Sequence, residues 1–71
     1  MKIIVNGKEM DISDGSSISK MLSQMGIQAG RVVVERNETE IISRSKFEDV
    51  ILNDGDRLEV LNFVGGGSYG N

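Results

Sequence analysis

The sequence predicts a small α+β domain in which one helix packs across one face of a mixed β-sheet. Short apolar runs of strand type begin near positions 3, 32 and 58, and one stretch of helical spacing lies between the first two. Strong turn sequences at Asn6-Gly7 and Asn53–Asp56 separate these elements. Because the chain has only 71 residues, we expect a single compact domain, which covers residues 1–64.

The first 12 residues predict a β-hairpin. Ile3–Val5 form a short strand, and Asn6 and Gly7 tolerate the positive φ that a type I′ turn requires. Residues 8–12 then alternate apolar and polar side chains, as a return strand with one buried face does.

A short amphipathic helix is expected next. A serine within residues 13–16 is in position to cap its start, and Gly26 is in position to end it in the left-handed conformation. The apolar stripe recurs at i, i+3, i+4 and i+7 and comprises Ile18, Met21, Leu22 and Met25.

The second half of the chain predicts three further strands. Residues 31–35 are a β-branched run, residues 40–42 a weaker strand, and residues 57–64 the last and longest strand. Residues 45–49 suit a single helical turn with Phe47 pointing inward. If the last strand pairs beside the first, inside the sheet, the architecture is the β-grasp, or ubiquitin-like, fold.

The composition excludes many functions. The chain has no Cys and no His, so it lacks a disulfide framework, thiolate ligands and the commonest general base, and we expect no metal site. The net charge is −3 without a cationic run, which argues against nucleic acid as a partner. The sequence shows neither a signal peptide nor a stretch of ~20 apolar residues, so we expect a cytoplasmic protein with no membrane partner.

Residues 65–71 differ from the rest of the chain. They carry no charge, no aliphatic side chain and four glycines, which predicts a flexible Gly-rich tail. A backbone without Cβ can pass through a narrow channel and approach a nucleotide closely. At ~3.3 Å per extended residue the tail carries Gly67 roughly 10 Å beyond Val64, far enough to enter a partner's cleft. A frayed end without a role is the alternative.

Strand parity predicts an exposed apolar patch beside this tail. Leu58 and Val60 are expected to face the helix, and alternate residues of a strand face opposite sides of the sheet. A one-residue shift in register would instead bury the patch. The predicted partner-binding patch comprises Ile4, Val33, Leu61 and Phe63.

Two charged segments have simpler interpretations. The charged residues of segment 35–40 are expected to form a solvated edge that adds charge complementarity to a partner. Asp54 and Asp56 flank Gly55, and turn chemistry accounts for both carboxylates.

Four short segments occur together in this chain: Val5-Asn6-Gly7, Val34-Glu35-Arg36-Asn37, Asn53-Asp54-Gly55-Asp56 and Phe63-Val64-Gly65-Gly66-Gly67. In this combination the chain resembles the sulfur-carrier family of thiamine biosynthesis, the ThiS proteins, which are ubiquitin-like. The resemblance covers Met1 to Gly67.

The resemblance implies a carrier protein and not an enzyme. Gly67 would be the acyl terminus that is adenylated and converted to a thiocarboxylate, and Gly65 and Gly66 would keep the tail narrow for threading. The implied partners are an adenylating enzyme of the ThiF type, a cysteine desulfurase system that supplies sulfur, and a thiazole synthase of the ThiG type. ATP and Mg²⁺ would be used by the adenylating enzyme, and this chain would bind no cofactor.

The chain departs from the family at its end, because Ser68–Asn71 follow the glycines. A peptide bond at Gly67 cannot be adenylated. Three explanations stay open: a processing protease exposes Gly67, the four residues are a remnant of recombinant expression, or the carrier role has been lost.

Other functions fit the same residues. A sister carrier would deliver sulfur to molybdopterin, homocysteine or another product by the same acyl chemistry. A plain ubiquitin-like binding module would have a tail without a role, and a covalent modifier would join Gly67 to a target lysine.

Overall fold

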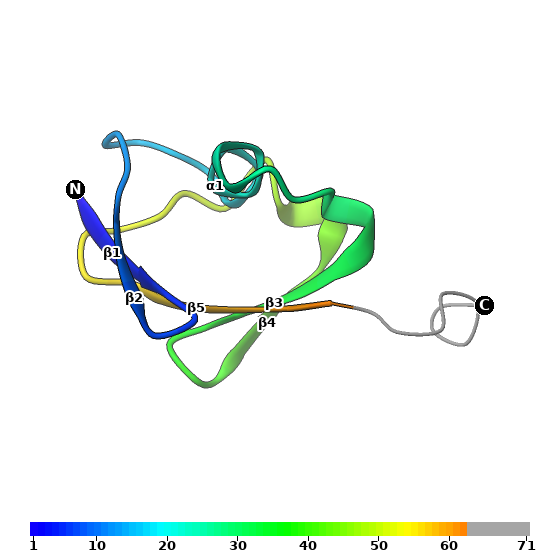
Figure 1. Cartoon of the computed structure of the whole chain (residues 1–71). Coiled ribbons are helices and arrows are strands. Elements are labelled where there is room, and N and C mark those ends of the chain that lie inside the picture. The colour runs from blue at the N-terminus through cyan, green and yellow to red at the C-terminus, as the bar shows by residue number, and fades with distance from the viewer. Residues whose placement is uncertain (63–71) are drawn as a thin grey trace.

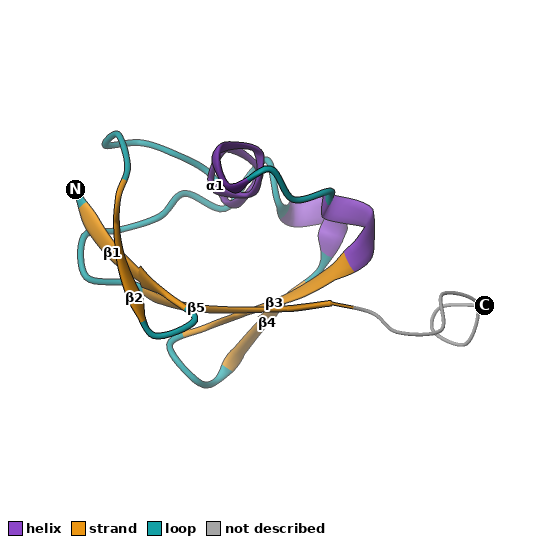
Figure 2. Ribbon diagram, in the orientation of Figure 1, coloured by secondary structure: helices purple, strands orange, loops and turns teal. Residues whose placement is uncertain are grey.

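A computed structural model of the chain describes residues 1–62 and shows one helix lying across a five-stranded mixed sheet (Figure 1). The strand order is β2-β1-β5-β3-β4. Figure 2 shows that the helix and the long loops lie on one side of the sheet. The strands are β1 (Lys2–Val5), β2 (Lys8–Asp11), β3 (Val32–Arg36), β4 (Glu40–Ile42) and β5 (Arg57–Asn62).

The last strand lies inside the sheet, as predicted. β5 pairs parallel with β1 and antiparallel with β3, while β1–β2 and β3–β4 are antiparallel hairpins. Asn6 and Gly7 join the first hairpin with φ of 51° and 83°, in the left-handed region that the Asn-Gly sequence predicts.

The helix α1 spans Ile18–Met25, as predicted, and ends at Gly26 with a φ of 74°. Its cap is Ser17 and not a serine of residues 13–16, because the Ser17 hydroxyl accepts the Lys20 N–H at 3.1 Å. Ser16 is buried instead, and its hydroxyl donates to the Ser13 carbonyl at 2.7 Å.

Two 3₁₀ turns shift the expected boundaries. Ala29–Arg31 form η1, so the third strand begins at Val32 and not at residue 31. The expected helical turn at 45–49 begins earlier, as η2 over Arg44–Lys46, because i→i+3 bonds already form at the Ser43 carbonyl. Phe47 is buried as expected. The expected end of the last strand at 63–64 and the tail at 65–71 lie outside the described residues.

The hydrophobic core fills the space between α1 and the sheet. Alternate residues of β1, β3 and β5 supply its sheet side, as strand parity predicts. The buried set comprises Ile3, Val5, Ile12, Ile18, Met21, Leu22, Val32, Val34, Ile42, Phe47, Leu52, Leu58 and Val60.

Candidate partner-binding face

The face of the sheet that points away from α1 carries two of the predicted patch residues side by side. Leu61 on β5 is 54% exposed and lies directly opposite Val33 on β3, which is partly exposed. No element of residues 1–62 covers this outer face (Figure 1). Phe63, the fourth expected member of the patch, lies outside the described residues, as do Gly65, Gly66 and Gly67.

Ile4 faces the same side but does not adjoin these residues. It pairs with Arg57 at the start of β5, four residues before Leu61, which is about 13 Å along a strand. The sequence-based prediction that Ile4 belongs to one contiguous patch with Val33 and Leu61 is therefore wrong. The cause is the parallel register of β1, which meets only the first part of β5.

Ile41 is an outer-face residue that the strand-parity argument omitted. It is 64% exposed and lies opposite Glu35 in the β3–β4 hairpin, diagonal to Val33. The signal was present in the sequence, because the neighbouring Ile42 is buried and consecutive strand residues face opposite sides. We define the outer apolar patch as Val33, Ile41 and Leu61.

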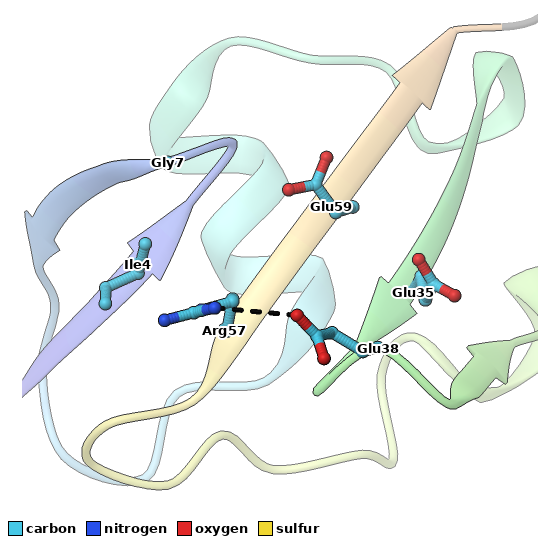
Figure 3. A pocket seen from close by; sticks show the side chains of 6 residues that line it. All are labelled: Ile4, Gly7, Glu35, Glu38, Arg57 and Glu59. Atoms are coloured by element: carbon cyan, nitrogen blue, oxygen red, sulfur yellow. Dashed lines mark ion pairs between the residues drawn. The ribbon is translucent and has the colours of Figure 1, made fainter.

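An open hollow with an acidic rim adjoins the outer apolar patch. Figure 3 shows the side chains of Glu35, Glu38 and Glu59 gathered on the outer face, with α1 behind the sheet. Glu35 and Glu59 are direct cross-strand partners, and like charges in that position destabilise a sheet. The lining residues are Ile4, Gly7, Glu35, Glu38, Arg57 and Glu59.

One ion pair crosses this hollow. Arg57 Nη1 lies 3.6 Å from Glu38 Oε2, and both side chains are exposed, so the pair is weak (Figure 3). Glu35 and Glu59 have no ion pair with any residue of 1–62. The hollow therefore offers two free carboxylates to a cationic group of a partner.

Arg36 does not belong to a solvated edge, contrary to the expectation for segment 35–40. Its side chain is only 17% exposed, and its guanidinium donates to Glu40 Oε1 at 2.9 Å and to the Ile51 carbonyl at 3.3 Å. Its Nη1 also lies 3.6 Å from Asp56 Oδ2. The hydrogen bond to Glu40 and the charges of both carboxylates raise the pKa of Arg36, against the opposing effect of burial.

Asp56 joins two of the four segments that carry the family resemblance. Its Oδ2 accepts the Asn53 N–H at 2.9 Å, and its Oδ1 accepts the Asn37 side-chain N–H at 3.3 Å. Residues 34–37 and 53–56 are therefore adjacent in the fold and hold one another. These segments build the scaffold, and residues 1–62 contain no cluster of three or more His, Cys, Asp or Glu side chains placed to hold an ion.

The comparison with known families decides the identity. The model of the ThiS family matches residues 3–67, which is nearly the whole chain. This chain belongs to the ThiS family. The fold agrees: a crystal structure of the thiamine biosynthesis protein ThiS from Geobacter metallireducens superimposes with a TM-score of 0.79 at 36% identity, covering 94% of this chain and 100% of that one. The β-grasp class predicted from the sequence is thus confirmed.

The curated relatives that match this ThiS-family chain include a sulfur carrier and two thiazole synthases. The sulfur carrier protein ThiS of Bacillus subtilis is 38% identical over 64 residues, which covers 89% of this chain and 96% of the relative. A thiazole synthase of Paramagnetospirillum magneticum is 41% identical over 68 residues, 96% of this chain. The chain spans 21% of the length of that synthase, and 21% of a second thiazole synthase from Magnetococcus marinus.

Among residues 1–62, none of the helical segments combines the length and the apolar character needed to traverse a bilayer.

Proposed function

We propose that this protein is a sulfur carrier for the thiazole of thiamine, with Gly67 as the acyl terminus. The observation that carries the proposal is the likeness to the sulfur carrier ThiS of Bacillus subtilis over 96% of that relative. The family model supports it as well, because the match extends to Gly67 and so includes the glycine run.

The proposed chemistry begins at a carboxylate, which is a poor electrophile. An oxygen of the Gly67 carboxylate attacks the α-phosphorus of ATP, an acyl–O–P bond forms and pyrophosphate leaves. A persulfide sulfur then attacks the acyl carbon and AMP leaves. A thiol reductant cleaves the resulting S–S bond with two electrons, and the thiocarboxylate remains on the carrier.

The groups that drive these steps belong to partners in this proposal. An adenylating enzyme of the ThiF type binds the ATP and Mg²⁺, a cysteine desulfurase system supplies the persulfide, and the carrier itself has no catalytic residue. A protease that removes Ser68–Asn71 is needed wherever the chain is made with those residues. We place these steps in the cytoplasm.

The sulfur acceptor is a thiazole synthase in this proposal. Support comes from the two thiazole synthases that contain a segment similar to nearly all of this chain within a longer polypeptide. Joining a carrier to its acceptor raises their effective concentration, which is useful when the two react with each other. Sister carriers that serve molybdopterin or homocysteine use the same acyl chemistry, so the acceptor is what distinguishes them.

The outer face is the docking surface in this proposal. The outer apolar patch supplies area to bury, and the free carboxylates of Glu35 and Glu59 favour a partner with a basic surface. Leu61 lies on the strand that leads to the glycine run, so docking there brings the tail to the same partner.

The test is reconstitution with a ThiF-type adenylating enzyme, ATP, Mg²⁺ and a persulfide donor, read by intact mass. We expect a chain ending at Gly67 to gain the adenylate and then exchange one carboxylate oxygen for sulfur, and a chain continuing to Asn71 to stay unchanged. Delivery of the sulfur to thiazole synthase, and not to a molybdopterin or homocysteine system, identifies the acceptor. A folded chain ending at Gly67 that is never adenylated contradicts the carrier role, and an isopeptide to lysine indicates a modifier instead.

A further inference from the structure

β5, the strand that leads to the tail, has neighbours of unequal length on its two edges. On one edge β3 pairs with it from Leu58 to Asn62. On the other edge β1 pairs only with Arg57 and Leu58, because β1 ends at Val5. Beyond Leu58 that second edge has no strand from residues 1–62 beside it.

The side chain of Asn6 fills the missing position. The Asn6 backbone N–H donates to the Leu58 carbonyl at 2.9 Å, as a further strand residue would. Asn6 Oδ1 then accepts the Val60 N–H at 2.8 Å, and Asn6 Nδ2 donates to the Val60 carbonyl at 3.4 Å. The amide thus supplies the donor and the acceptor that one more residue of β1 would have supplied.

This contact lies at the root of the tail. Val60 is 8% exposed and is the last buried residue of the described chain, and Gly67 follows seven residues later. Leaving a buried N–H and carbonyl unpaired is costly, so the Asn6 amide holds the Val60 backbone in place. It does so next to Leu61, whose side chain belongs to the outer apolar patch.

We propose that Asn6 is a positioning residue for the acyl tail: by holding the β5 backbone at Val60, it fixes where and in which direction the chain leaves the sheet toward Gly67. The inference rests on the proposed carrier function. A partner that binds the outer apolar patch then meets the end of β5, from which the chain continues toward the terminal carboxylate, in a fixed place beside that patch. Well-defined positioning of a reacting group accelerates a reaction, and a displacement of about 1 Å can slow it 100-fold.

Asn37 offers a matched control at the opposite end of β5. Its backbone N–H donates to the Arg57 carbonyl at 2.7 Å, and its Oδ1 accepts the Arg57 N–H at 2.9 Å. Both asparagines are exposed and have positive φ, 51° for Asn6 and 53° for Asn37. Because glycine adopts positive φ without strain, Asn6→Gly and Asn37→Gly each remove an amide without straining the turn.

The experiment compares these two variants in chains that end at Gly67, which keep all of the described fold. With a ThiF-type enzyme and ATP, pyrophosphate release should show kcat lowered roughly 10-fold by Asn6→Gly, with the KM for the carrier changed less. Asn37→Gly should leave kcat unchanged, although urea unfolding shows a comparable loss of stability. Asn6→Asp keeps the oxygen that accepts the Val60 N–H and should fall between Asn6→Gly and the parent chain.

Hydrogen exchange of the full chain provides a second readout. After correction for the global stability of each variant, the Val60 amide should exchange faster in Asn6→Gly than in the parent chain. In Asn37→Gly it should exchange at the parent rate. The positioning role is overturned if the two glycine variants have equal kcat, or if Val60 exchange is unchanged in Asn6→Gly. In either case, adenylation of the parent chain still supports the carrier function. If the folded parent chain is not adenylated, the carrier function fails and the positioning role falls with it.

Discussion

Asp56 is the only charged side chain among residues 1–62 that is buried, at 7% exposure. Its two oxygens accept hydrogen bonds from Asn53 and Asn37, and the Arg36 guanidinium lies 3.6 Å away. A buried carboxylate is stable only when it is paired and hydrogen-bonded, and this one meets both conditions. The residue therefore locks the turn before β5 to the turn after β3.

We predict that Asp56→Asn lowers the free energy of unfolding by about 1–3 kcal/mol, because the amide nitrogen cannot accept a hydrogen bond and the charge pairing is lost. Urea unfolding measures the change. Asp54→Asn is the control in the same turn, since Asp54 Oδ1 accepts the Lys2 N–H at 2.8 Å and asparagine keeps that oxygen. The free energy of unfolding of Asp54→Asn should stay within about 0.5 kcal/mol of that of the parent chain. Equal losses of stability in both variants would contradict the account.

Leu61 has the opposite character, an exposed apolar side chain with little effect on folding. We predict that Leu61→Ala changes the free energy of unfolding by less than about 0.5 kcal/mol but weakens binding to the adenylating enzyme by about 1–2 kcal/mol. Isothermal titration measures the affinity. Ile51→Ala is the control, because Ile51 is 47% exposed but lies beside Ser17 at the start of α1. Equal affinity of the two variants would argue against the outer apolar patch.

At the scale of elements, the sequence predicted what depends on neighbouring residues and missed what depends on register. The α1 stripe, the Asn6-Gly7 hairpin and the turn before β5 follow from local patterns, and the structure contains all three. Parity along β1 placed Ile4 on the outer face, but parity does not say which residue of β5 lies beside it. The β1–β5 register, a tertiary property, separates Ile4 from the outer apolar patch.

Sequence patterns also did not predict the hydrogen bonds between side chains and the backbone of distant segments. Asn6 was interpreted as a turn former, which it is, but its side chain also completes one edge of β5, and the side chain of Asn37 completes the other. Arg36 was interpreted as solvated because its neighbours are charged. Its low exposure depends on the Ile51 carbonyl and Asp56, which approach from a later part of the chain. The tail was predicted from composition alone and stays a prediction.

The Glu35–Glu59 pair connects the β3–β5 ladder to binding. We predict that Glu59→Gln stabilises the fold by roughly 0.2–1 kcal/mol, because it removes a like charge directly across the strands. The same change should slow association with the adenylating enzyme and reduce its salt dependence. Stopped-flow association at two ionic strengths measures this. Glu48→Gln is the control, because it makes the same change in net charge at an exposed residue away from the outer face. Glu48 follows Phe47, whose carbonyl accepts a hydrogen bond from the Ser19 N–H of α1, and this variant should leave association unaltered.

At the scale of the whole molecule, one strand connects docking and chemistry. β5 presents Leu61 and Glu59 on the outer face, contributes Leu58 and Val60 to the core, and continues in sequence toward Gly67. A small domain with a net charge of −3 and no His or Cys has few groups for catalysis of its own. Its proposed role is to present one carboxylate to successive partners that recognise the same face.

The most direct test of the carrier role is the intact mass of the protein purified, without a tag, from its native host grown without thiamine. The account predicts a chain that ends at Gly67, with a fraction in which sulfur replaces one oxygen of the terminal carboxylate. A population that uniformly retains Asn71 and carries no sulfur under this growth condition would contradict it, and the ubiquitin-like binding module would then explain the chain better.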